Sequence, residues 1–301
     1  MKTFSILITT KDRLNDLKIT INSLSNLIRR KDVECVVCDD GSADDTFNYI
    51  KNEFPGIRLI RNSKSKGLIF SRNRMLNLTK ADYAISLDDD ANFITNKPLE
   101  IIDSYFNQNP TCGVIAFRIF WSKNRPIDSN TSNKKIRVKG FVGCGHVWNM
   151  KAWKTIPNYP DWFVFYGEED FAAFELFKKR WEIHYLPQIL IQHRVDVKGR
   201  KNYKDYRLRL RRSLRAGWYL YLLFYPWQLI PKKIIYTLWM QLKLKVFKGD
   251  MKALVAIIQA FLDVIINLGR LFMNSNRLTI SEFEDFSKIS DTKLYWEPEN
   301  N

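Results

Sequence analysis

The sequence has few of the residues that define several common protein classes. Its 301 residues include 4 cysteines and 3 histidines. So few cysteines argue against a small secreted domain built on disulfides. Cys35 and Cys38 form a C-x-x-C pair, but they lie in the apolar run 33–38, which has the character of a strand. Residues three apart on a strand point to opposite faces, so we interpret both as core side chains.

The sequence also lacks a long apolar run. The stretch 4–8 is too short for a secretory signal, and the charged residues of 11–13 follow it. The longest charge-free stretch, 216–231, contains Pro226 and is shorter than the ~20 residues that span a bilayer. These absences fit a cytoplasmic protein that binds a membrane surface peripherally.

Acidic residues are scarce in one segment. The net charge is +16 overall, and residues 198–270 hold 16 basic residues against 3 acidic ones, or +13. Residues 1–197 carry +6 and the segment from 271 carries −3. A basic, aromatic-rich segment suits anionic lipid, a polyanionic acceptor or nucleic acid, and charge alone does not choose among them.

The first hundred residues alternate short β-rich runs with helical patterns, which is typical of a parallel α/β sheet. We predict strands over 4–9, 33–38, 57–60 and 83–87, followed by a strand over 114–120, a helix over 168–179 and a strand over 183–191. Beyond residue 198 the composition changes to basic, aromatic and leucine residues in helical spacing. We therefore expect a catalytic α/β domain over 1–200 and a helical extension over 201–301.

A cationic stretch precedes an aromatic one in this extension. The arginines are Arg207, Arg209, Arg211, Arg212 and Arg215, and the aromatic residues are Trp218, Tyr219, Tyr221, Phe224, Tyr225 and Trp227. Such side chains favour the headgroup boundary of an anionic membrane. We expect the extension to lie on the membrane surface; packing onto the catalytic domain or an oligomer interface is the alternative.

Acidic clusters follow two of the predicted strands. Asp39 and Asp40 end the second strand, and Asp88, Asp89 and Asp90 end the fourth. Ligands of open α/β sheets bind outside the carboxyl ends of the strands, so these carboxylates should face a cleft. Adjacent carboxylates repel one another unless a cation neutralises them, and oxygen ligands of this type suit Mg²⁺ or Mn²⁺.

Six motifs in order resemble the family 2 inverting glycosyltransferases of the GT-A fold, a Rossmann-like nucleotide-sugar-binding fold. They lie at 9–13 (TTKDR), 39–42 (DDGS), 67–73 (Gly67 to SRN), 87–90 (LDDD), 143–145 (GCG) and 167–170 (GEED). The resemblance covers about residues 3–200, and it extends to bacterial members that build surface polysaccharides. It implies inverting transfer of a sugar from a UDP- or dTDP-sugar to a hydroxyl of a lipid-linked or polysaccharide acceptor.

The resemblance implies a role for each matching residue. Thr9 and Asp40 would border the nucleobase, with Asp39 as the neighbouring candidate, and the remaining donor-binding residues would be Thr10, Arg13, Arg72, Asp88 and Asp89. Asp90 would bind Mn²⁺ or Mg²⁺ with His193, because some relatives have a histidine ligand at this place. We interpret His184, within a strand, as structural.

Inversion requires a base that takes the proton of the acceptor hydroxyl. The family register places Glu169 at this position, whereas the family's preference for aspartate favours Asp170, so we keep both, with Glu169 slightly ahead. Gly145, His146 and Trp162 are candidate acceptor-binding residues.

Two other functions are possible on the sequence. A sugar-1-phosphate nucleotidylyltransferase shares the α/β layout, but it requires a glycine-rich phosphate loop after the first strand, and residues 9–13 contain no glycine. A nucleic-acid-binding protein could use the basic segment 198–270, but that function leaves the carboxylate clusters unexplained. We therefore do not expect nucleic acid as a partner.

Overall fold

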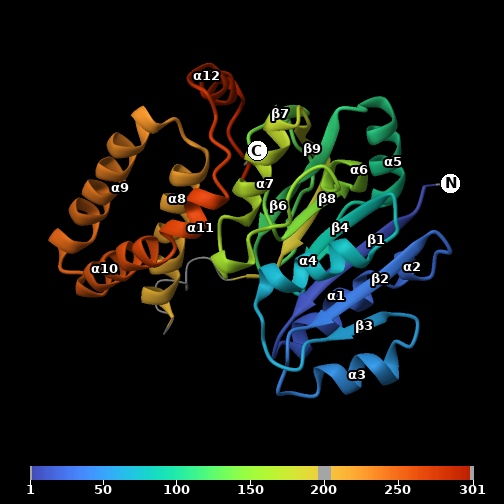
Figure 1. Cartoon of the computed structure of the whole chain (residues 1–301). Helices are drawn as coiled ribbons and strands as arrows, with labels where there is room; N and C mark the ends of the chain where they lie inside the picture. The colour runs from blue at the N-terminus through green and yellow to red at the C-terminus, as the bar shows by residue number, and fades with distance from the viewer. Residues whose placement is uncertain (1, 196–204, 299–301) are drawn as a thin grey trace.

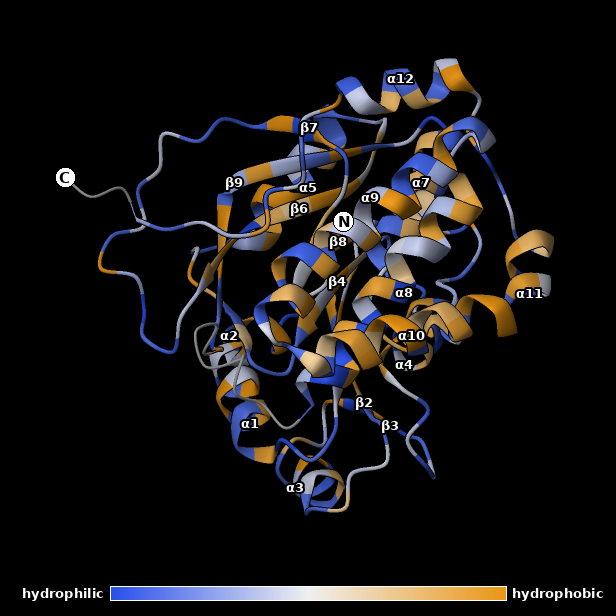
Figure 2. Cartoon of the chain, turned by 90° about the vertical axis from the view of Figure 1, so that its left-hand side faces the viewer, coloured by the Kyte–Doolittle hydropathy of each residue, from blue (hydrophilic) through white to orange (hydrophobic). Residues whose placement is uncertain are grey.

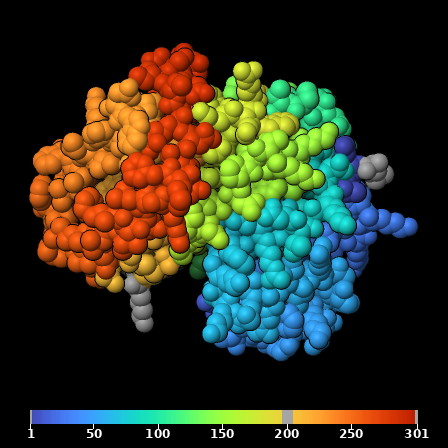
Figure 3. Space-filling view, in the orientation of Figure 1, coloured from blue at the N-terminus to red at the C-terminus, as the bar shows by residue number. Residues whose placement is uncertain are grey.

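The computed structural model describes residues 2–195 and 205–298 (Figure 1). A curled sheet flanked by helices occupies one side of the molecule, and the helices of the C-terminal region occupy the other. The space-filling view shows the two regions in contact along a broad boundary (Figure 3).

One nine-stranded sheet organises the first region, in the order β3-β2-β1-β4-β8-β6-β9-β5, with β7 paired to β9. Neighbours β1, β2, β3 and β4 are parallel, whereas β8 is antiparallel to both β4 and β6. The strands are β1 Phe4–Thr10, β2 Val33–Asp39, β3 Arg58–Arg61, β4 Tyr83–Asp88, β5 Ala91–Phe93, β6 Cys112–Trp121, β7 Ile136–Val138, β8 Gly145–Asn149 and β9 Glu182–His193.

Helices cover both faces of this sheet. Those of the first region are α1 Leu14–Ser23, α2 Ser25–Ile28, α3 Thr46–Glu53, α4 Leu68–Leu78, α5 Pro98–Gln108, α6 Met150–Trp153 and α7 Glu168–Lys178. Those of the C-terminal region are α8 Tyr206–Phe224, α9 Ile230–Leu244, α10 Met251–Ile266, α11 Leu268–Met273 and α12 Ile280–Lys288. The predicted strands and the predicted helix before β9 are confirmed to within two residues at each end.

Two hydrophobic clusters lie on opposite faces of the sheet. Side chains of α1, α3 and α5 pack on one face, and side chains of α4, α6, α7 and α8 pack on the other. Cys35 belongs to the first cluster and Cys38 to the second, as the strand alternation predicts. All four cysteines are free and buried, so their interpretation as core side chains is confirmed.

The expectation for the arginines and aromatic residues of α8 is wrong in part. Trp218, Tyr219 and Phe224 are buried, because α8 packs against the sheet region on one side and against α10 on the other. Asp263 of α10 accepts a hydrogen bond from Arg211 Nε at 2.7 Å and lies 3.4 Å from Arg215 Nη1. The alternative of packing therefore holds for this part of the extension, and these groups do not form a free surface.

The apolar surface of the C-terminal region lies elsewhere, on α9, α10 and α11 (Figure 2). Within the described ranges, no helix is both long and apolar enough to cross a membrane.

Candidate active site

The first group of candidate residues lies where β2 ends. Asp40 is buried, and both of its carboxylate oxygens accept hydrogen bonds from the loop before α4: from Asn62 Nδ2 (2.7 Å), Ser65 Oγ (2.7 Å), and the backbone N–H groups of Lys66 (2.8 Å) and Gly67 (2.9 Å). Burial opposes ionisation, but these hydrogen bonds outweigh it and lower the pKa of Asp40. The carboxylate therefore fixes the loop that leads into α4.

Asp39 presents a different environment. Its Oδ1 accepts the N–H of Ser42 at 2.8 Å, whereas its buried Oδ2 accepts no hydrogen bond from the described residues and lies 3.3 Å from Arg61 Nε. Of the two adjacent aspartates among the three predicted nucleobase partners, Asp39 thus has the oxygen with spare acceptor capacity. Thr9, the third, is half-buried, and its hydroxyl is without a hydrogen bond to the described part of the chain.

Three carboxylates lie at the end of β4 and directly after it. Asp89 stabilises the fold, whereas Asp88 and Asp90 lie next to a histidine. Asp89 is buried and holds α1 and β1, since it accepts from Thr10 Oγ1 at 2.8 Å and pairs with Arg13 at 3.0 Å. Burial raises the pKa of Asp89 to about 7, and the charge of Arg13 opposes this shift. Asp89 is therefore not open to a sugar hydroxyl in this structure.

Asp88, Asp90 and His193 form a candidate metal site. One ligand atom from each lies within 4.8 Å of the other two, and His193 Nε2 is 2.9 Å from Asp90 Oδ1 and 3.8 Å from Asp88 Oδ2. The pairing of β5 with β9 places Ala91 opposite His193, so residues about a hundred positions apart meet here. Burial disfavours the Asp90 anion, but His193 and Arg13 outweigh it and keep its pKa low.

The donor set fits Mn²⁺ or Mg²⁺. Carboxylate oxygens are ligands that both ions accept, and imidazole is a better ligand for Mn²⁺ than for Mg²⁺.

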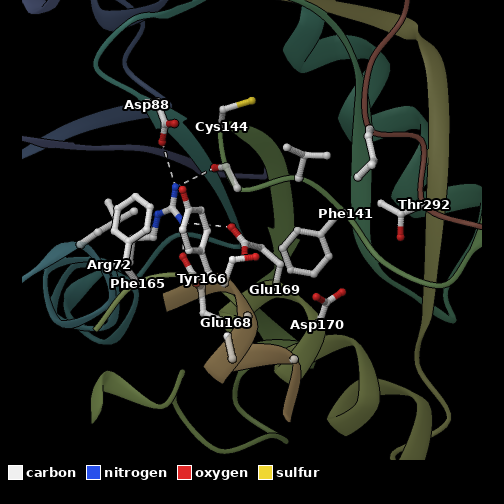
Figure 4. Close-up of a pocket in the computed structure, with 18 of the residues that line it drawn as sticks. Arg72, Asp88, Phe141, Cys144, Phe165, Tyr166, Glu168, Glu169, Asp170 and Thr292 are labelled. Carbon is white, nitrogen blue, oxygen red and sulfur yellow. Dashed lines mark hydrogen bonds and ion pairs between the residues drawn. The ribbon is translucent and has the colours of Figure 1, made fainter. Parts of the chain in front are cut away.

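Arg72 connects this site to the start of α7 (Figure 4). Its guanidinium is buried and donates to Asp88 (2.8 Å), Glu168 (3.0 Å), Glu169 (3.2 Å) and the carbonyl of Gly143 (2.9 Å). One buried cation is thus shared by three carboxyl groups. We predicted that Arg72 contacts the nucleotide-sugar. In this structure its guanidinium N–H groups donate to carboxylates instead.

The start of α7 carries three consecutive carboxyl groups. Tyr166 and Gly167 adopt positive φ values of 72° and 87°, which turn the chain sharply into the helix. Burial, and then the charge of Glu169, raise the pKa of Glu168 to about 8. Burial also raises the pKa of Glu169, against the effect of Arg72.

Asp170 differs from its two neighbours. No described residue forms a hydrogen bond or ion pair with its carboxylate. Asp170 is exposed to solvent at the cavity, and the surrounding protein, followed by the charge of Glu169, raises its pKa to about 6. Both candidate bases therefore titrate above their ordinary range.

These groups line a cavity of about 430 Å³. Arg72, Asp88, His193 and the three carboxyl residues of α7 line its polar side. Gly143 has no space for a side chain, because a Cβ atom there would lie 1.9 Å from Glu169 Oε1 and 2.7 Å from Arg72 Nη1. This close approach explains Gly143, the first glycine of the GCG motif.

The predicted acceptor residues lie outside the lining. His146 is 1% exposed between Phe141 and Trp148, and burial followed by the charge of Arg72 lowers its pKa to about 3. Gly145 is buried in β8, where a Cβ atom would lie 2.6 Å from Ile191. Trp162 packs on Phe163 and Tyr219. His184 is structural as predicted, since it bonds Tyr105 Oη and Glu182.

Sequence reasoning missed other residues of the cavity lining. They come from four separate parts of the chain: Trp121 of β6; Phe141; Ser213, Ala216, Gly217 and Leu220 of α8; and Thr292 and Leu294 of the C-terminal region. No local motif marks them, because they meet only through long-range packing.

Comparisons with known proteins bear on this arrangement. The family model described as "Glycosyl transferase family 2" matches residues 5–181. The Escherichia coli protein "UDP-Glc:alpha-D-GlcNAc-diphosphoundecaprenol beta-1,3-glucosyltransferase WfaP" is 38% identical over 69 residues, which are 22% of this chain and 27% of WfaP.

Solved glycosyltransferase structures share the fold at low identity. GalNAc-T7 with UDP, GalNAc and Mn²⁺ has a TM-score of 0.58 at 14% identity, over 74% of this chain and 48% of its own. The mannosyltransferase PcManGT from Pyrobaculum calidifontis, with GDP-Man and Mn²⁺, has a TM-score of 0.55 at 13% identity, over 95% and 79%. Staphylococcus aureus TarS 1-349 with UDP-GlcNAc has 0.52 at 15%, over 72% and 66%. The chain thus spans about a quarter of WfaP and half of GalNAc-T7, and its sheet region has the GT-A fold.

Proposed function

This chain belongs to glycosyl transferase family 2, and from that premise we propose that it transfers a sugar from a UDP-sugar, with inversion, to a hydroxyl of a lipid-linked acceptor. One observation carries the proposal: Arg72 joins Asp88 of the Asp88–Asp90–His193 cluster to the carboxylates that begin α7, and Asp88, His193 and these carboxylates line one cavity, with Asp90 buried behind them. A site for a metal-bound diphosphate and a site for a proton acceptor are thereby adjacent.

On the donor side, Asp39 is the proposed partner of the uracil imide N–H, because its Oδ2 has spare acceptor capacity while Asp40 fixes the loop. Asp88, Asp90 and His193 would hold Mn²⁺ or Mg²⁺, whose charge stabilises the departing diphosphate. The Mn²⁺ in the GalNAc-T7 and PcManGT structures supports this choice of ion.

On the acceptor side, we propose Glu169 as the base. Its carboxylate shares Arg72 with Asp88, so it lies close to where the anomeric carbon of a metal-bound donor would sit. The acceptor oxygen forms a bond to the anomeric carbon as the bond to the UDP oxygen breaks, and the acceptor proton passes to Glu169. Asp170 is the alternative base, because no described residue neutralises it.

The acceptor class rests on a second line of support. The name of the E. coli relative specifies a diphosphoundecaprenol-linked acceptor. Such a substrate resides in a membrane, and the C-terminal region of this chain exposes an apolar face that suits a membrane surface. That face consists of Ile235, Tyr236, Trp239, Phe247, Met251, Val255, Ile258, Phe261, Leu262, Ile265, Ile266, Phe272 and Met273, each at least 40% exposed.

Charge around this face favours an anionic surface. Lys232, Lys233, Lys243, Lys248 and Lys252 are exposed beside it. The two acidic residues of this segment are occupied within the fold, since Asp250 accepts from Tyr206 and the N-terminus of α10, and Asp263 pairs with Arg211. Each basic residue near an anionic bilayer contributes about 1 kcal/mol before screening. We propose peripheral association through this face, at the cytoplasmic side.

The direct test is a panel of nucleotide-sugars, scored for nucleotide release with GlcNAc-diphosphoundecaprenol present, with Mn²⁺ or with chelator. We expect release from at least one UDP-sugar, dependent on the metal. Pyrophosphate release from a nucleoside triphosphate and a sugar phosphate, with no nucleotide release from any sugar donor, would contradict the proposal.

A further inference from the structure

The C-terminal segment 289–296 is attached to the catalytic sheet region after leaving α12. Ser290 forms a β-bridge with Val138, and the N–H of Lys139 donates to its carbonyl at 2.8 Å. Trp296 forms a second β-bridge, with Phe120, and its N–H donates to the carbonyl of Ile119 at 2.7 Å. Backbone pairing thus fixes the segment at both ends.

Side chains strengthen this attachment. Trp296 is 6% exposed, and the guanidinium of Arg118 lies 4.3 Å from its ring centroid. Lys139 Nζ lies 2.8 Å from Asp291 Oδ1.

Between its two anchors the segment alternates as a strand does. Thr292 and Leu294 line the cavity, whereas Lys293 and Tyr295 do not line it and are exposed. The period of two therefore places alternate residues at the cavity, of which Thr292 is partly buried and Leu294 is 56% exposed. This arrangement provides lining residues and matched non-lining neighbours in the same segment.

The lining face approaches the candidate base region. A Cβ atom on Gly140 would lie 2.8 Å from Thr292 Oγ1 and 3.7 Å from Asp170 Oδ1, so both oxygens approach one point next to this glycine. Figure 4 shows Thr292 and Asp170 on one side of Phe141, with Glu169 and Arg72 on the other. A hydroxyl and an unneutralised carboxylate together suit the hydroxyl groups of a sugar ring.

The segment also contacts the aromatic residue beside the metal site. Leu294 accepts a hydrogen bond from Trp121 Nε1 at 2.9 Å, and the Trp121 ring lies 4.5 Å from the His193 ring, centroid to centroid. Trp121 also lines the cavity. An aromatic side chain at the edge of a polar pocket can cover the apolar face of a sugar ring.

We propose that residues 289–296 build the acceptor subsite of this enzyme: Asp170 and Thr292 bind hydroxyls of the acceptor's terminal sugar, and Trp121, held by Leu294, covers its apolar face. The inference rests on the proposed function and assigns the acceptor wall of that same cavity. Transfer to the acceptor then depends on a segment more than a hundred residues beyond the catalytic motifs.

The test uses the full chain loaded with UDP and Mg²⁺, and a panel of methyl glycosides of common hexoses and N-acetylhexosamines as probes, with binding followed by ligand-observed NMR. We expect at least one glycoside to bind in the millimolar range. Thr292→Val, which removes the hydroxyl and keeps the shape, should weaken that binding about tenfold, as expected for the loss of about one hydrogen bond. Lys293→Ala is the matched control and should leave binding unchanged.

Trp296→Ala removes the buried side chain that anchors the end of the segment, and it should weaken glycoside binding while UDP affinity stays unchanged. This variant tests the segment independently of Thr292. If UDP does not bind the wild-type chain, the proposed function fails. If UDP binds but no glycoside does, or if Thr292→Val and Lys293→Ala bind glycoside alike, the acceptor subsite is wrong while the proposed function stands.

Discussion

The two regions of this molecule differ in where their apolar and charged side chains lie. In residues 2–195 the large exposed apolar side chains are few and scattered, as at Ile19 and Leu78, and the carboxylates gather at one cavity. In residues 205–298 the apolar side chains of α9, α10 and α11 face outward and basic residues surround them. The sheet region thus has a polar cavity, whereas the helical region has an exposed apolar surface with basic residues beside it.

Where the regions meet, the difference becomes functional. The sheet region contributes Asp88, His193 and the carboxyl residues of α7 to the cavity lining, and the C-terminal region contributes residues of α8 and the segment 289–296. The proposed metal ligands come from the sheet region alone, whereas the proposed acceptor subsite combines Asp170 and Trp121 of the sheet region with Thr292 of the other. Substitutions on the donor side and on the acceptor side should therefore have separable effects.

The largest effect on turnover is expected from replacing the proposed proton acceptor. Glu169→Gln keeps the shape of the side chain and removes its basicity, so turnover should fall by about 10² or more at unchanged UDP affinity. Asp170→Asn should instead raise the KM for acceptor and lower turnover less. The measurement is the turnover of both variants. If Asp170→Asn lowered turnover more than Glu169→Gln, Asp170 would be the base.

A smaller effect, confined to the helical region, tests the membrane face. Ile258 and Ile19 are each 53% exposed, on α10 and α1 respectively. Ile258→Glu places a charge on the proposed face and should weaken sedimentation with phosphatidylglycerol vesicles about tenfold, since burying one aliphatic side chain contributes about 1.5–3 kcal/mol. Ile19→Glu is the matched control and should change nothing.

Two outcomes would remove the membrane from this account. One is that the wild-type chain does not sediment with such vesicles at low salt. The other is a change from dimer to monomer in Ile258→Glu measured by light scattering, which would make the face a self-association surface.

The smallest effect is a pH dependence on the sheet side. A general base acts only when ionised, so the raised pKa of Glu169 predicts that kcat decreases as the pH falls through a value above the ordinary glutamate range, and a base at Asp170 would place the decrease near pH 6. A rate profile from about pH 8 to 5 at saturating metal measures this. A flat profile over that range would show that neither carboxyl group titrates there during turnover.

The sequence predicted the sheet region well, because its information is local. Apolar runs mark β1, β2 and β4, and the carboxylates of 39–40 and 88–90 follow them at the edge where such sheets bind ligands. The resemblance supplied Asp90 and His193, which the β5–β9 pairing then brings together. What sequence could not decide was how Asp39 and Asp40 divide their roles, since that depends on the loop donors that Asp40 engages.

The helical region was predicted less well for a physical reason. Trp218 and Trp239 lie in similar basic, aromatic surroundings, yet Trp218 is 3% exposed and Trp239 is 52% exposed, because one faces neighbouring helices and the other does not. Composition does not record which face of a helix is covered. The contact of Thr292 with the catalytic cavity depends in the same way on long-range packing, which no motif records.

The measurement that tests the central claim most directly is UDP affinity, by calorimetry, with Mn²⁺ and with chelator, in the wild-type chain and in Asp90→Asn. We predict that Mn²⁺ strengthens UDP binding at least about tenfold in the wild type, because a cation held by Asp88, Asp90 and His193 would neutralise charge on the diphosphate. In Asp90→Asn this gain should disappear, while binding without metal stays the same. Equal UDP affinity with and without Mn²⁺ in the wild type, or a full gain in Asp90→Asn, would contradict the account.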